Sequence, residues 1–153
     1  MLEFLAAYDR FWQRDNYVGH VTASAWVVNQ ERSQVLLTHH KKFDCWLQLG
    51  GHIESGDLSL LSAALREAKE EWGIQAIELL QATLFDVGHH PIRPKQEPPH
   101  VHFDVRFLLV AKDINFVVSD ESLDWFALED VPAISQSSAL FRMVKKMNRS
   151  NKS

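Results

Sequence analysis

Hydrophobic positions along the chain follow two periods, one typical of helices and one typical of strands. Apolar residues have helical spacing from Leu2 to about Gln13 and, most strongly, from Ser59 to about Trp72. In the second helix Leu61, Leu65, Ala68 and Trp72 form the predicted core-facing side. Ser59 is suited to cap its start and Gly73 to end it. The run SQSSALFRMVKKMN predicts a C-terminal helix before a polar tail at 149–153.

Five apolar runs are typical of strands. They are HVTASAWVV (20–28), VLLTH (35–39), IELLQATLFDV (77–87), HVHFDVRFLLVAK (100–112) and LDWFAL (123–128). The polar turn NQERSQ predicts that the first two are antiparallel. GHHPIRPKQEPP (88–99) is predicted to be a loop, of a length usually found in functional loops. Strands and helices do not alternate regularly, so we predict an α/β fold of the α+β type, with a mixed sheet packed between helices.

Composition narrows the class of protein. A chain of 153 residues with 46% hydrophobic and 24% charged residues is typical of one globular domain, which we place at 1–153. The net charge of −4 argues against an extended nucleic-acid surface. Cys45 is the only cysteine, which excludes a disulfide framework and a Cys-rich zinc site. The chain has no signal-peptide pattern and no membrane-length apolar run, so we expect a cytoplasmic protein without a membrane partner. Whether the protein forms a homodimer is left open by the sequence.

Three acidic residues, Glu67, Glu70 and Glu71, share the last turn of the predicted helix at 59–72. Like charges at this spacing repel, and the helix dipole disfavours negative charge there. A solvated acidic face is one explanation. However, the glycine-rich bend LGGHIESG precedes the helix, and glycine lets main-chain carbonyls approach a ligand closely. Three carboxylates and a carbonyl form an oxygen site suited to Mg²⁺ or Mn²⁺.

The segment GGHIESGDLSLLSAALREAKEEWGI (50–74) resembles the Nudix box, which reads Gly, five residues, Glu, seven residues and then Arg-Glu-aliphatic-any-Glu-Glu-any-Gly-aliphatic. Matches to that motif are Gly51, Arg66, Glu67, Glu70, Glu71, Gly73 and Ile74. Asp57 replaces the first Glu of the motif, and eight residues instead of seven separate it from Arg66. We expect the extra residue to be absorbed where the loop enters the helix.

The resemblance extends from about Val21 to Pro132 and implies a Nudix-like fold. It also implies a metal-dependent hydrolase that cleaves the diphosphate linkage of a nucleoside diphosphate joined to another group X. By the same resemblance Glu67, Glu70 and Glu71, with the Gly51 carbonyl, are the expected ligands of Mg²⁺ or Mn²⁺. The expected catalytic pair is Glu67 as general base and Arg66 as the residue that orients a carboxylate.

Alternatives remain for the base and for the function. Glu97 in the Pro-rich loop and Glu121 near the fifth strand are candidate bases, or ordinary solvated acids. A Nudix-fold module that binds or senses a nucleotide without turnover is the second hypothesis, although the complete acidic set favours an enzyme. Hydrolysis at RNA 5′ ends is a third, and the absence of a basic stripe disfavours it.

One predicted strand carries a second polar group of residues. By alternation His100, His102, Asp104 and Arg106 share one face, while Val101, Phe103, Val105 and Phe107 point into the core. We predict that the polar face contacts substrate. A transition-metal site of His100, His102 and Asp104 is conceivable, but solvation or hydrogen bonding explains the same pattern.

Overall fold

The computed structural model describes residues 1–41, 44–72, 77–79, 84–112 and 122–151, without the side chains of 71, 72 and 77–79. The helices are α1 (Leu2–Ala7), α2 (Leu60–Trp72), α3 (Val131–Ile134) and α4 (Ser138–Ser150). The strands are β1 (Gly19–Val28), β2 (Gln34–His40), β3 (Cys45–Leu47), β4 (Leu49–His52), β5 (Ile77–Leu79), β6 (Asp86–Ile92), β7 (His100–Ala111) and β8 (Leu123–Ala127).

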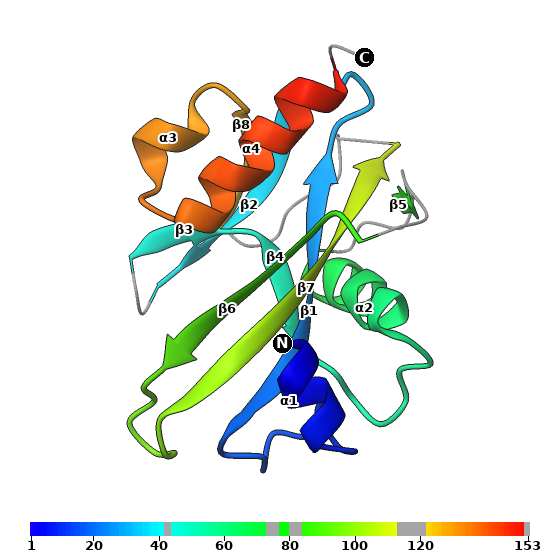
Figure 1. Ribbon diagram of the computed structural model, residues 1–153. Helices are drawn as coiled ribbons and strands as arrows, with labels where there is room; N and C mark the ends of the chain where they lie inside the picture. Colours follow the sequence, from blue (N-terminus) through cyan, green and yellow to red (C-terminus); the bar gives the residue numbers. More distant parts are fainter. Residues whose placement is uncertain (42–43, 73–76, 80–83, 113–121, 152–153) are drawn as a thin grey trace.

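The strands form one mixed sheet, as predicted (Figure 1). At its centre β1 and β7 run parallel, with Gly19 opposite Val101 and Val28 opposite Val110. The other pairings are antiparallel: β1 with β2 and β4, β2 with β3 and β8, and β7 with β5 and β6. The predicted antiparallel pairing of the first two strands is therefore confirmed.

Each face of the sheet packs against its own helices. Alternate residues of β1 divide between two cores: Ala25 and Val27 pack with α1 and α2, while Trp26 and Val28 pack with α3 and α4. Figure 1 shows α2 and the α3–α4 pair on different parts of the molecule. The predicted arrangement of a sheet between helices is thus confirmed.

The buried side of α2 includes the predicted one, but alanines lie at its centre. Ala63, Ala64 and Ala68 are fully buried, whereas Leu61 and Leu65 are only partly buried. The side chain of Trp72 lies outside the described residues. Small side chains let the helix backbone come close to β1 and β4, which is why alanines take the centre of the interface.

Several predicted boundaries were wrong. The first helix ends at Ala7, well before Gln13, and the C-terminal helix continues to Ser150, into the predicted tail. Strand β6 continues to Ile92, so it occupies the first part of the predicted 88–99 loop. It contains Pro91, and among the described strands it pairs only with β7, a position at which proline is tolerated. No helix in the described part of the chain is long and apolar enough to cross a membrane.

Candidate active site

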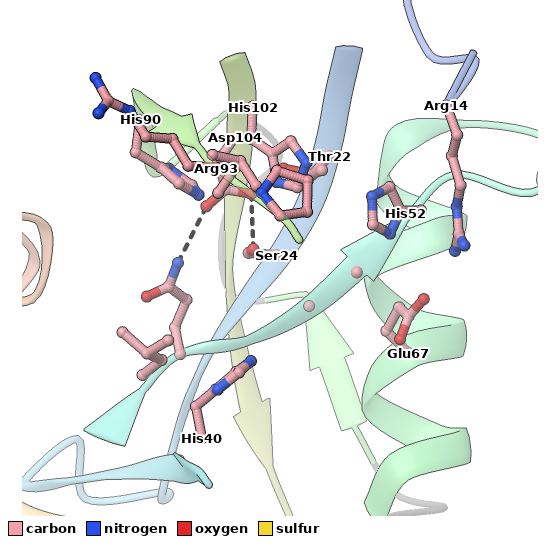
Figure 2. A pocket seen from close by; sticks show the side chains of 16 residues that line it. Arg14, Thr22, Ser24, His40, His52, Glu67, His90, Arg93, His102 and Asp104 are labelled. Carbon is pink, nitrogen blue, oxygen red and sulfur yellow. Dashed lines mark hydrogen bonds between the residues drawn. The ribbon is translucent and has the colours of Figure 1, made fainter. Parts of the chain in front are cut away.

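A pocket of about 520 Å³ is shown in Figure 2. It opens on the same face of the sheet as α4, next to the part of that face that α4 covers. Thr22 and Ser24 of β1 line it, just before Trp26 on the same face enters the core beneath α4. β4, β6, β7, α2 and the segment after α1 supply other walls. The lining residues include Arg14, Gln48, Gly50, Gly51, His52, Glu67, His90, Arg93, His102 and Asp104.

Asp104 fixes the floor of this pocket. One carboxylate oxygen accepts hydrogen bonds from the Thr22 hydroxyl at 2.9 Å and the Ser24 hydroxyl at 2.7 Å. The other accepts from Gln48 Nε2 at 3.0 Å and from Arg106 Nε at 2.7 Å. Asp104 is 2% exposed, so these four donors satisfy a buried charge and hold it in one orientation.

Behind Asp104 lies a buried ion network. Arg106 does not line the pocket; its NH1 donates to Asp86 at 2.6 Å, and Asp86 also accepts from Arg142 and Lys146 of α4. Burial alone would raise the pKa of Asp86, but the hydrogen bonds from Arg142, Lys146 and Arg106 hold that pKa well below its usual range. Of the four predicted strand residues, the pocket is therefore lined by His102 and Asp104, whereas Arg106 lies behind it and the buried His100 is not part of the lining.

The Glu67 carboxylate packs directly against Gly51. A Cβ atom at Gly51 would lie 2.4 Å from Glu67 Oε1, so the absence of a side chain at Gly51 creates the space for this carboxylate. The Glu67 side chain is 14% exposed and receives a hydrogen bond from Arg66 NH1 at 3.1 Å. The strand β4 and the helix α2 together thus place one acid of the last turn at the pocket wall.

Asp57 supports Arg66 although it is shorter than the glutamate of the Nudix box. Its two carboxylate oxygens accept from Arg66 Nε at 3.0 Å and Arg66 NH2 at 2.9 Å, and these bonds lower the pKa of Asp57. At the start of α2, Ser59 and Ser62 cap the helix reciprocally through backbone N–H to hydroxyl bonds of 3.0 and 2.8 Å. The shortened side chain and the longer spacing therefore leave the arginine fixed.

The other predicted acids occupy different environments. Glu70 is 63% exposed and its carboxylate lies 3.2 Å from Arg66 NH1. The side chain of Glu71 and the whole of Glu121 lie outside the described residues, as do Gly73 and Ile74. Glu97 is exposed and does not line the pocket.

The donors present fit a hard divalent cation. Glu67 and Glu70 offer carboxylate oxygens from positions one helical turn apart, and the Glu67 carboxylate packs against the backbone of Gly51, which has a main-chain carbonyl to offer. Oxygen donors of this kind suit Mg²⁺ and Mn²⁺. Glu67, Glu70 and Gly51 would be the residues to hold such an ion.

Basic and imidazole side chains complete the pocket. Arg14 and Arg93 both line it and lie on different sides of it in Figure 2. Burial, together with the nearby Arg14 and the imidazoles of His20 and His100, lowers the pKa of His52 to about 4. Sequence reasoning missed Arg14, Arg93 and His52. Arg14 lies in a segment without a recognisable motif, Arg93 is in the Pro-rich stretch, and His52 is at a position of the 50–74 segment that the motif does not specify.

Comparison with known proteins supports the resemblance of the acidic segment. The sequence model of the NUDIX domain matches residues 18–147, which is most of the chain. The chain belongs to the Nudix family of hydrolases. A search of curated proteins found no significant match.

Solved structures of Nudix proteins share the fold. A NUDIX family hydrolase from Clostridium perfringens is 27% identical, with a TM-score of 0.62 over 86% of this chain and 97% of that one. The C. elegans Ap4A hydrolase is 18% identical, with a TM-score of 0.64 over 85% and 96% of the two chains. The E. coli dihydroneopterin triphosphate pyrophosphohydrolase is 16% identical, with a TM-score of 0.60 over 82% and 92%. The predicted fold class and family are confirmed.

Proposed function

We propose that this Nudix protein hydrolyses the pyrophosphate linkage of a nucleoside diphosphate joined to a second group, with Mg²⁺ or Mn²⁺ as cofactor. The observation that carries the proposal is the packing of Glu67 against Gly51 at the pocket wall. A merely solvated acidic face would need neither a glycine opposite the carboxylate nor a partly buried arginine–aspartate pair behind it. Here both are present, and they direct an acid into a nucleotide-sized pocket.

Different residues of the site have different roles in the proposed hydrolysis. Arg14 and Arg93 would bind phosphate oxygens, since guanidinium groups match their geometry. Glu67 would accept the proton of the attacking water, and Arg66, held by Asp57, would keep Glu67 oriented. Water oxygen then bonds to phosphorus while the anhydride oxygen leaves, giving a nucleoside monophosphate and the phosphorylated second group.

A divalent ion held by Glu67, Glu70 and Glu71 with the Gly51 carbonyl would supply charge neutralisation at the phosphate oxygens and polarise the attacking water. The charges of the side chains that line the pocket support a need for a cation. Glu67 and Asp104 both border it, and two carboxylates there would otherwise repel a diphosphate.

A small nucleotide is the proposed partner, and the cytoplasm the proposed compartment. The net charge of −4 supports a small substrate over an extended nucleic acid. The single cysteine, Cys45, is consistent with a reducing compartment.

A panel of compounds tests the proposal. It should contain nucleoside diphosphates linked to sugars or to a second nucleoside, nucleoside triphosphates and a 5′-triphosphorylated RNA, each with Mg²⁺ and with Mn²⁺. We expect release of a nucleoside monophosphate from at least one diphosphate-linked compound, and loss of that release after chelation. Tight binding with no product from any compound would instead establish a nucleotide-binding module, and cleavage of the RNA alone would establish 5′-end hydrolysis.

A further inference from the structure

Four histidine rings from three strands gather beside the pocket: His20 of β1, His52 of β4, and His100 and His102 of β7. The His20 ring centroid lies 5.0 Å from that of His52, 5.0 Å from that of His100 and 4.6 Å from that of His102. His20 is opposite His102 in the parallel pairing of β1 and β7. The central strands therefore place imidazoles from distant parts of the sequence side by side.

The imidazole of His20 is buried without a hydrogen-bond partner. The residue is 1% exposed, and neither ring nitrogen has a partner among the described residues. The backbone of Asn16 is close enough to favour the protonated form, but it makes no hydrogen bond of normal geometry. Unpaired buried nitrogens are costly, so a group that binds to His20 would relieve a cost that the fold alone leaves in place.

His100 is oriented in the way that metal-binding histidines are. Its Nδ1 donates to the Pro98 carbonyl at 2.8 Å, which fixes the ring and leaves the lone pair on Nε2. His100 Nε2 lies 3.2 Å from His102 Nε2. Two nitrogens bound to one tetrahedral ion at about 2.0–2.1 Å are themselves about 3.3 Å apart.

A third nitrogen completes the set. One ligand atom from each of His20, His100 and His102 lies within 4.8 Å of the others, so His20 needs only a small shift to share an ion with the other two. The neutral imidazole is the form that binds metals.

We propose that His20, His100 and His102 bind a divalent transition-metal ion such as Zn²⁺. Imidazole nitrogens favour Zn²⁺, Ni²⁺ or Cu²⁺ over Mg²⁺, so this site is separate from the carboxylates of α2 and selects a different class of ion. Because His102 also lines the pocket, three histidine ligands leave a fourth coordination position for water or for an anionic group bound there.

Cobalt(II) is a probe that separates the two kinds of site. A four-coordinate histidine site gives Co²⁺ a strong visible absorption, whereas an octahedral oxygen site gives a weak one. The whole chain should be stripped with a chelator and then titrated with Co²⁺. We expect a strong band that saturates at about one equivalent and disappears when Zn²⁺ is added.

Substituted variants test which residues bind the Co²⁺ ion that gives the strong band. His20→Gln and His100→Gln should each abolish the strong band, with circular dichroism confirming that they fold. His89→Gln, which changes an exposed histidine of β6 outside the cluster, and Glu70→Gln, which changes an acid of α2, should both retain it. A weak spectrum in the unmodified protein, or a strong band that persists in both His20→Gln and His100→Gln, would overturn the proposal.

Discussion

At the scale of residues, three small residues set the position of Glu67, the acid at the pocket wall. Gly51 leaves the space that the Glu67 carboxylate occupies, and Ala63 and Ala64 let α2 lie close to the sheet. The motif of the sequence indicated which acids matter. It did not indicate which of them would be held at the wall of the pocket.

Gly51→Ala tests this arrangement. The new Cβ would occupy the place of Glu67 Oε1, so the carboxylate must rotate away while the backbone stays nearly unstrained. We expect turnover to fall by at least about tenfold, with a loss of less than about 1 kcal/mol in the free energy of unfolding.

Gly56→Ala is the matched control for that change. A Cβ at Gly56 meets no atom within 4 Å, so this variant should keep the rate of the unmodified protein. Equal rates in Gly51→Ala and the unmodified protein would show that the Glu67 position does not depend on Gly51.

Residue-level prediction succeeded where contacts are local in sequence. The Ser59 cap acts within the first turn of α2, and it is present. Arg14, Arg93 and His52 could not be found in the same way, because only the folded sheet brings them to one pocket.

At the scale of elements, β7 changes character along its length. On one face it runs from the histidines through Asp104 and Arg106 to Leu108 in the apolar core. On the other face Phe103, Val105 and Phe107 pack toward α1 and α2, as the alternation predicted. The polar face of β7 is therefore not a single substrate-contacting surface, because Asp104 and Arg106 belong to a buried ion network.

Opposite faces of β7 should respond differently to substitution. Phe103 stacks on Phe4 with ring centroids 4.5 Å apart, so Phe103→Ala should reduce the free energy of unfolding by about 3 kcal/mol. His102→Gln, on the pocket side, should change stability by less than about 1 kcal/mol but alter KM or kcat. Urea denaturation beside a rate assay measures both, and the reverse pattern would mean that the faces are exchanged.

Elements with a strong period were the predictable ones. The strands β1 and β7 and the helix α2 each have long, regular apolar patterns, and they lie almost where expected. β6 was missed in part because its polar, proline-containing sequence DVGHHPI lacks the alternation, and its pairing with β7 supplies the order instead. The apolar pattern of the first predicted helix extends beyond the end of α1. The segment after α1 instead lies against β1, where the Val21 N–H donates to the Phe11 carbonyl.

At the scale of the whole molecule, Asp86 joins the pocket side of the sheet to the C-terminal helix. Its carboxylate, 1% exposed, accepts from Arg106 of β7 and from Arg142 and Lys146 of α4. Removing its charge leaves the buried Arg106 with fewer partners. We expect Asp86→Asn to lower the free energy of unfolding by about 3 kcal/mol at neutral pH.

The effect of that change should depend on pH. The pKa of Asp86 is lowered in the folded protein, so its stabilisation is complete above the unfolded value of about 3.9 and is lost as the pH falls below it. Urea denaturation over a pH series should therefore show the gap between the unmodified protein and Asp86→Asn narrowing below about pH 4. A gap that is constant over the series would show that the carboxylate charge does not link sheet and helix.

The most direct test of the central claim is the turnover of Glu67→Gln and Glu70→Gln, with and without Mg²⁺, on the compound that the unmodified protein cleaves. If the acidic turn serves hydrolysis, both variants should melt within a few degrees of the unmodified protein without metal, because the repulsion that each change removes offsets the loss of one ion pair to Arg66. Their turnover with Mg²⁺ should fall by orders of magnitude, and chelation should abolish the activity of the unmodified protein. Unchanged rates in both variants, or full activity after exhaustive chelation, would contradict the account.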